Sequence, residues 1–176
     1  MSSKIFMKRA FIPNILTFMN LSFGIMSLLA TVQGDYLNSG LFILGAGLVD
    51  RYDGRIARLL NAEGPLGKEL DSLSDLVSFG VAPAILAYIM FNLIEIRFLG
   101  LIPIILFPVA GAYRLARYNS ATFNGVFMGV PITIAGCALT LFMLLLRNNL
   151  DLRFLVIMLM MAFAYLMVST IKLQKR

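Results

Sequence analysis

Apolar segments long enough to approach the width of a bilayer recur along the whole chain. A helical span needs about 20 apolar residues, and six segments come close to this: 11–32, 37–57, 70–94, 97–118, 126–146 and 150–172. The 176 residues are 60% hydrophobic and 14% charged, whereas soluble proteins carry about 25% charged residues. We therefore predict an all-α, polytopic membrane protein with six transmembrane helices and a single membrane-embedded domain over residues 1–176.

Basic residues gather at alternate ends of these predicted spans. Of the 15 Lys and Arg residues, all but Arg97, Arg147 and Arg153 lie at the N-terminus, after the second or fourth span, or in the C-terminal tail. Short loops rich in Lys and Arg stay in the cytoplasm. We therefore expect both termini to be cytoplasmic, in a multi-pass protein of the cell membrane. Because the basic residues form no continuous patch, no nucleic-acid partner is expected.

Carboxylates are concentrated in one stretch, 50–75, which holds six of the nine acidic residues. Asp50 and Asp53 are three residues apart and Asp71 and Asp75 are four apart, so each pair lies on one face of a helix. Gly64-Pro65 interrupts the chain between the pairs and folds it back. Converging carboxylates repel unless cations lie between them, and oxygen ligands select Mg²⁺, Mn²⁺ or Ca²⁺. We predict a site for two divalent ions, facing the cytoplasm at the membrane boundary.

The residues between the two pairs suit a phosphate ligand. Gly54 follows Asp53 directly, so a nucleotide can approach the backbone closely. Arg58 lies one helical turn further and can bind two phosphate oxygens at once, while Ala57 keeps the surface between them small. Taken singly, Gly54 and Arg58 are better explained by helix packing and by membrane topology. Together with four aspartates they indicate a phosphate site.

The stretch resembles a known signature. It reads Asp50-x-x-Asp53-Gly54-x-x-Ala57-Arg58, then eight residues, then Gly67-x-x-x-Asp71-x-x-x-Asp75. This pattern is similar at every fixed position to that of the CDP-alcohol phosphatidyltransferases. The run from Gly67 to Ala84, the segment Arg114-Leu-Ala-Arg117-Tyr-Asn119 and Gly129-Val-Pro131 look like the phosphatidylserine synthase branch of that family.

The resemblance implies a six-helix enzyme, commonly a homodimer. It would transfer the phosphatidyl or archaetidyl group of CDP-diacylglycerol or CDP-archaeol to the hydroxyl of L-serine by metal-assisted in-line attack, with Mg²⁺ or Mn²⁺, and release CMP. The implied metal ligands are the four aspartates, of which Asp75 also acts as the base. The implied CDP-lipid-binding residues are Asn14, Thr17, Gly54, Ala57, Arg58, Gly64 and Gly67.

Three further residues are candidates for contacts with the acceptor. Arg114 and Arg117 lie three residues apart at the cytoplasmic end of the fourth span, where they could bind the carboxylate of serine or a lipid phosphate. Topological anchoring explains them equally well. Ser78 is a candidate polar contact, although serine in a membrane helix often bonds to its own backbone or to a neighbouring helix.

Two alternatives remain open on the sequence. A transferase of the same family could use glycerol 3-phosphate, inositol or inositol phosphate as acceptor. A divalent-cation transporter would instead require carboxylates along the depth of several helices. The clustering of the acidic residues in one stretch favours the enzyme.

Overall fold

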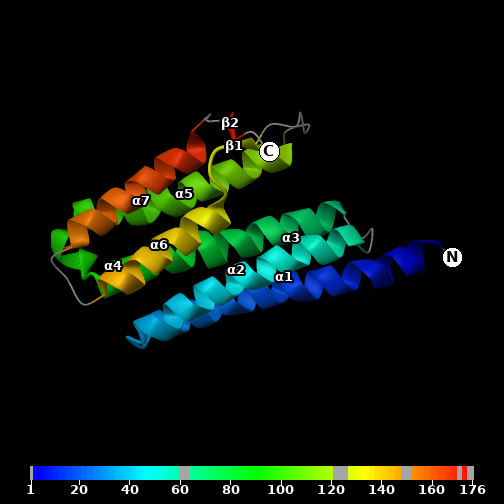
Figure 1. The fold of residues 1–176 in the computed structure, drawn as a ribbon, viewed down its shortest axis with the longest axis horizontal. Helices are drawn as coiled ribbons and strands as arrows, with labels where there is room; N and C mark the ends of the chain where they lie inside the picture. Colours follow the sequence, from blue (N-terminus) through cyan, green and yellow to red (C-terminus); the bar gives the residue numbers. More distant parts are fainter. Residues whose placement is uncertain (1, 60–63, 121–126, 148–151, 170–171, 174–176) are drawn as a thin grey trace.

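In a computed structural model, the part of the chain that the structure describes forms six helical segments, arranged as Figure 1 shows. The structure describes residues 2–59, 64–120, 127–147, 152–169 and 172–173, and the side chains of 14–56, 59, 64–120, 129–147 and 152–169. The segments are α1 (Ser2–Val32), α2 (Tyr36–Leu59), a composite third segment, α5 (Phe98–Ser120), α6 (Ile132–Leu146) and α7 (Arg153–Val168). They overlap the predicted helical segments in order, which confirms the helical class, whereas six membrane crossings stay a prediction.

The third segment combines two types of helix. It consists of α3 (Pro65–Asp75), the π-helical η1 (Leu76–Val81) and α4 (Ala82–Met90). Pro65 occupies the first turn, where the missing N–H is tolerated, so the helix begins five residues before the predicted start at 70. It ends four residues before the predicted end at 94, because Asn92 has a φ of 48°. The 3₁₀ turn η2 (Leu93–Ile96) then leads to α5.

The last two helices are shorter than the predicted spans 126–146 and 150–172. Pro131 precedes α6 with a φ of −56° and a ψ of 139°, which is an extended conformation and not a helical one. Before it, the two-residue strand β1 (Phe127–Met128) pairs antiparallel with β2 (Lys172–Leu173). The predicted fifth and sixth spans therefore include residues that belong to this small pairing, a feature that the all-α prediction did not contain.

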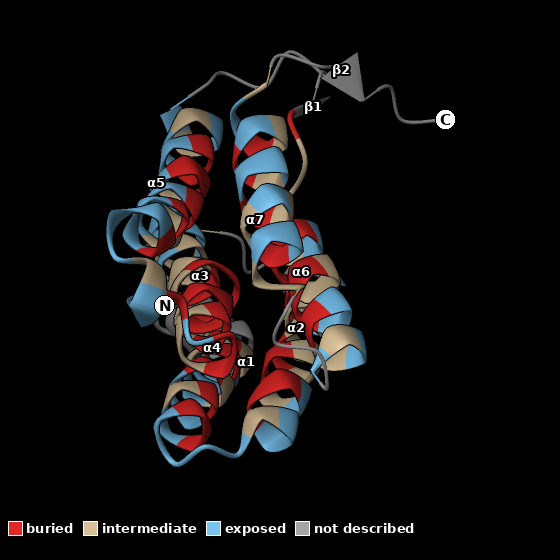
Figure 2. Cartoon of the chain, turned by 90° about the vertical axis from the view of Figure 1, so that its left-hand side faces the viewer, coloured by how far each residue is buried: buried red, intermediate tan, exposed pale blue. Residues whose placement is uncertain are grey.

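The helices form two groups with α6 between them. α1 packs along α2 and also contacts α3, η1 and α4, while α5 packs along α7 (Figure 1). The inward faces are buried and the outward faces are exposed (Figure 2). At the centre, Phe79 of η1 is fully buried beside Gly136 of α6. Ile43, Phe107 and Leu139 are fully buried in the same core.

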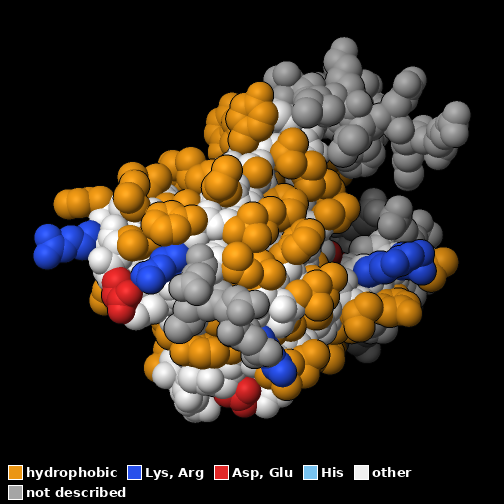
Figure 3. Space-filling model, turned by 60° about the vertical axis from the view of Figure 1, so that its left-hand side comes forward, with side chains coloured by type: hydrophobic (Ala, Val, Ile, Leu, Met, Phe, Trp, Pro, Cys, Tyr) orange, Lys and Arg blue, Asp and Glu red, His pale blue; other side chains and the backbone are white. Residues whose placement is uncertain are grey.

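Many large hydrophobic side chains are exposed on the outside of the helices. Hydrophobic side chains cover much of the described surface in Figure 3, where the charged side chains are few and scattered. Three helical stretches, Asn14–Val32, Pro65–Met90 and Phe98–Ser120, are long and apolar enough to cross a membrane. α6 and α7 are apolar but have only 15 and 16 residues, or about 22 to 24 Å at 1.5 Å per residue, against a hydrocarbon thickness of about 30 Å. These features are those of a membrane protein.

Candidate active site and metal centre

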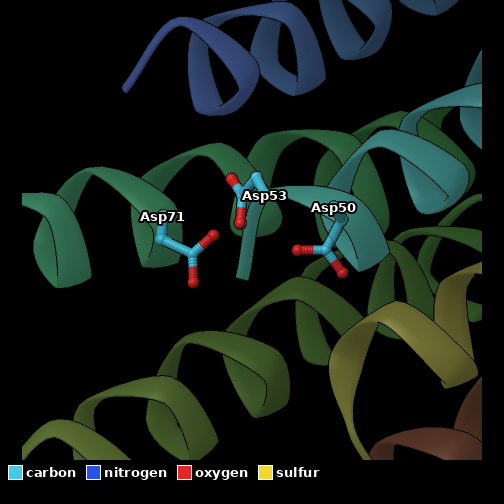
Figure 4. Close-up of side chains that lie close together, drawn as sticks. All are labelled: Asp50, Asp53 and Asp71. Carbon is cyan, nitrogen blue, oxygen red and sulfur yellow. The ribbon is translucent and has the colours of Figure 1, made fainter. Parts of the chain in front are cut away.

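Three of the four predicted aspartates lie together. Asp50 and Asp53 come from the second half of α2, and Asp71 comes from α3. Each offers a carboxylate oxygen that is within 4.8 Å of the others. Figure 4 shows the three side chains facing a common space between the helices. Residues 60–63, between α2 and α3 in the sequence, lie outside the described residues. We call these three aspartates the acidic cluster.

Asp75, the fourth aspartate, lies beside this cluster and, like Asp53, is buried. Its side chain is 7% exposed, and it interacts with Asp50. The Nδ2 atom of Asn20, on α1, donates a hydrogen bond of 3.0 Å to Asp75 Oδ1. Asp75 is therefore held by the first helix while it faces the carboxylates of the second.

Two hydroxyl groups hold members of the acidic cluster. Thr17 of α1 donates from Oγ1 to Asp53 Oδ2 at 2.8 Å. Thr133 of α6 donates from Oγ1 to Asp50 Oδ2 at 3.2 Å. The cluster thus lies where four helices meet, although its carboxylates come from only two of them.

The acidic cluster fits a divalent cation. Asp71 Oδ1 is buried and has no hydrogen-bond partner, which leaves an acceptor available to an ion. Carboxylates at this separation repel one another, and a cation between them removes the repulsion. Because all the ligand atoms are oxygens, the site suits Mg²⁺, Mn²⁺ or Ca²⁺ and not a soft metal.

Several predicted CDP-lipid residues lie close to the acidic cluster. Gly54 directly follows Asp53, and a side chain added there would meet no atom within 4 Å. A Cβ atom added at Gly67 would lie 3.6 Å from Asn14 Oδ1, so the N-terminal helix reaches the start of α3. Gly64 precedes α3 and is also open. The side chains of Ala57 and Arg58 lie outside the described residues.

The predicted acceptor residues differ in their surroundings. Arg114 is 8% exposed, its Nε atom is buried without a partner, and its charge interacts with Asp75. Arg117 instead donates from Nη1 to the backbone oxygen of Val168 at 3.1 Å. Ser78 is fully buried and donates to the backbone oxygen of Asn20 at 2.9 Å. The role of Ser78 as an acceptor contact stays a prediction.

Sequence reasoning gave no role in the site to Asn20 or Thr133, and it named Asn119 only as part of the family resemblance. Asn20 and Thr133 bind aspartates from α1 and α6. Asn119 of α5 donates from Nδ2 to Ser72 Oγ at 3.0 Å and to a carboxylate oxygen of Glu69 at 3.3 Å, while its own Oδ1 is buried and unpartnered. The available signal was that Asn20 is a polar amide inside an apolar segment, where such groups are often functional.

The fold and site define a class: a helical membrane protein whose second and third helical segments bring together carboxylates that could bind a metal. Comparison with known proteins identifies the family. The model described as CDP-alcohol phosphatidyltransferase matches residues 10–169, so the chain belongs to this family. The resemblance seen in the sequence is confirmed.

Relatives from bacteria and archaea are similar over most of the chain. A CDP-diacylglycerol–serine O-phosphatidyltransferase of Bacillus subtilis is 35% identical over 132 residues, which cover 74% of each chain. A protein of the same name from Methanocaldococcus jannaschii is 37% identical over 164 residues, or 93% of this chain and 74% of the relative. An archaetidylserine synthase of Methanothermobacter thermautotrophicus is 36% identical over 137 residues, or 76% of this chain and 58% of the relative.

Proposed function

We propose that this protein transfers the phosphatidyl or archaetidyl group of a CDP-lipid to the hydroxyl of L-serine and releases CMP. Family membership and the names of the bacterial and archaeal relatives support this activity. The observation that carries the proposal is the convergence of Asp50, Asp53 and Asp71 from two helices, with their ligand oxygens within 4.8 Å. Such a site suits chemistry at a pyrophosphate, where negative charge must be stabilised.

The four aspartates divide into two roles in this proposal. The acidic cluster holds divalent cations, two in number, of Mg²⁺ or Mn²⁺, which supply positive charge where the pyrophosphate binds. Asp75 contributes to metal binding and accepts the proton of the serine hydroxyl. The serine oxygen forms a bond to the phosphorus that carries the lipid, and the bond from that phosphorus to the oxygen of CMP breaks. CMP leaves with the electron pair.

The CDP-lipid is proposed to bind beside the acidic cluster, over α2 and the start of α3. The openness at Gly54 and Gly64 gives a nucleotide access to the backbone, and Gly67 adjoins Asn14. Thr17 bonds to Asp53 in this structure, so it can support the site as well as contact the ligand. The other two proposed contacts with the CDP-lipid are Ala57 and Arg58.

Arg114 is the proposed ligand of the serine carboxylate. The Nε atom of Arg114 is buried without a hydrogen-bond partner, which is costly, and an anionic substrate would supply the missing hydrogen bond. Its proximity to Asp75 would bring the carboxylate close to the base. Arg117 already bonds to the end of α7, so it is the weaker candidate.

The membrane arrangement is also a proposal. A single domain over residues 1–176 would cross the cell membrane six times, with both termini and the active site on the cytoplasmic side, as the distribution of Lys and Arg favours. α6 and α7 would cross with the help of the segments that flank them. A homodimer is proposed from family resemblance.

The distribution of carboxylates argues against a cation transporter. In the part of the chain whose side chains the structure describes, the buried or half-buried carboxylates are Asp50, Asp53, Asp71 and Asp75, all in one region. Asp35, Glu69 and Glu95 are exposed. A permeation path would instead require polar groups along the depth of the helices.

CMP release by the purified protein tests the proposal. The protein in detergent or liposomes is given CDP-diacylglycerol or CDP-archaeol and excess Mn²⁺ or Mg²⁺, with L-serine, glycerol 3-phosphate, inositol or inositol phosphate as acceptor. Release that depends on L-serine is expected. Release with another acceptor would overturn the substrate, and no release with any acceptor would overturn the activity.

A further inference from the structure

Two neutral donors hold the acidic cluster from outside the helices that carry it. Thr17 and Thr133 each donate to one oxygen of one aspartate, and the bonds join residues 36 and 83 positions apart in the chain. The third aspartate of the cluster, Asp71, keeps a buried oxygen without any partner. The cluster therefore combines two carboxylates of fixed orientation with one that is open to a ligand.

The chemistry of these donors distinguishes them from ordinary charge partners. A Lys or Arg in the same place would neutralise the carboxylate and compete with a cation for it. A hydroxyl fixes one carboxylate oxygen, restricts rotation of the side chain and leaves its negative charge in place. Hydroxyl donors thus orient the ligands of a cation without replacing the cation.

Threonines in membrane helices usually satisfy their hydroxyls on their own backbone. Thr140, two turns after Thr133 on α6, does so by donating to the backbone oxygen of Gly136 at 2.8 Å. Thr133 instead reaches across to Asp50 of α2. The two side chains provide a functional candidate and a matched control on one helix.

We propose that Thr17 and Thr133 are positioning residues for the metal site: they orient Asp53 and Asp50 so that one oxygen of each is presented to the ion. The inference rests on the proposed function, because it takes the acidic cluster to bind a divalent cation. Loss of hydrogen bonds of this kind to metal ligands typically lowers metal affinity by about 10- to 100-fold. Neither residue contacts the metal.

Mn²⁺ binding to the full-length protein in detergent, without substrate, is the test. Free Mn²⁺ is measured by electron paramagnetic resonance during titration of the wild type and of Thr133→Val, Thr133→Ser, Thr140→Val and Thr17→Val. Valine has nearly the shape of threonine but lacks the hydroxyl, whereas serine keeps it. Both Thr133→Val and Thr17→Val should bind Mn²⁺ about 10-fold or more weakly. Thr133→Ser and Thr140→Val should stay within about 3-fold of the wild type, well short of that loss.

The outcomes separate this inference from the function on which it rests. The positioning role would be overturned, with the metal site left intact, if Thr133→Val or Thr17→Val bound Mn²⁺ as tightly as the wild type. It would also be overturned if Thr140→Val lost as much Mn²⁺ affinity as Thr133→Val. Failure of serine at position 133 to restore binding would overturn it too, because the hydroxyl would then not be the cause. If the wild type itself binds no Mn²⁺, the proposed metal site fails and the inference fails with it.

Discussion

The close contact between α6 and η1 predicts the effect of adding a methyl group at Gly136. A Cβ atom added at Gly136 would lie 2.4 Å from the backbone oxygen of Phe79 and 2.8 Å from its Cα. Ordinary contact begins at 3.4 Å, so the two segments must separate by about 1 Å. Because the obstacle is backbone, no side-chain rotation relieves it. Thr133 lies one turn before Gly136 and would move with α6.

Gly136→Ala is therefore expected to impair both stability and activity. Overpacking of this kind costs about 1 to 3 kcal/mol, and a 1 Å displacement near reacting groups can lower the rate by about 100-fold. Thermal unfolding in detergent and serine-dependent CMP release measure the two effects. Gly45→Ala on α2 is the control, because a Cβ atom there meets nothing within 4 Å and alanine favours a helix by about 1 kcal/mol. If Gly136→Ala matches Gly45→Ala in both assays, the close packing of α6 on η1 is refuted.

Three other predictions concern the chemistry. Asp75→Asn should lower kcat by about 100- to 10,000-fold and leave CDP-lipid binding nearly unchanged; full turnover would remove Asp75 as the base. Arg114→Met should lower kcat/KM for serine by about 10- to 150-fold, because one hydrogen bond to a charged group contributes about 1.5 to 3 kcal/mol. The KM for CDP-lipid should change little. An equal loss of kcat/KM in Arg117→Met would contradict the distinction between the two arginines. Removal of divalent ions with a chelator should abolish CMP release, and added Mn²⁺ or Mg²⁺ should restore it; activity that persists in excess chelator would rule out the metal role.

The helices and the aspartates were predictable because both depend on short-range patterns. Apolar runs indicated the six helical segments, and the spacing of Asp50 from Asp53 placed both on one face of α2. The sequence could not show which donor would meet which carboxylate. Thr133 and Asp50 are 83 residues apart, and their contact depends on how α6 packs against α2. A threonine in an apolar segment carries no local mark of such a role, because it can also bond to its own helix.

The ends of helices were harder to predict than the helices themselves, because few residues fix the backbone conformation as proline does. Pro65 marks the start of α3, but hydropathy alone placed that start at 70 because the first turn contains charged residues. The π-helical geometry of η1 also has no local signature in Leu76–Val81. It arises beside close contacts with other segments, since Gly24 of α1 and Gly136 of α6 pack directly against Ser78 and Phe79.

The π-helical turn sets the angular relation between the two halves of one helical segment. Each residue of an α-helix turns the chain by about 100°, and a π-turn includes one residue more than an α-turn. Residues after η1 are therefore rotated relative to an uninterrupted α-helix. Asp71 and Asp75 on α3 can therefore face the acidic cluster while Leu86 and Ala87 on α4 face the core. An uninterrupted α-helix would fix a different angle between these two faces. Removing one residue from η1 would restore the ordinary phase and turn either the carboxylates or the packed face away from its partners.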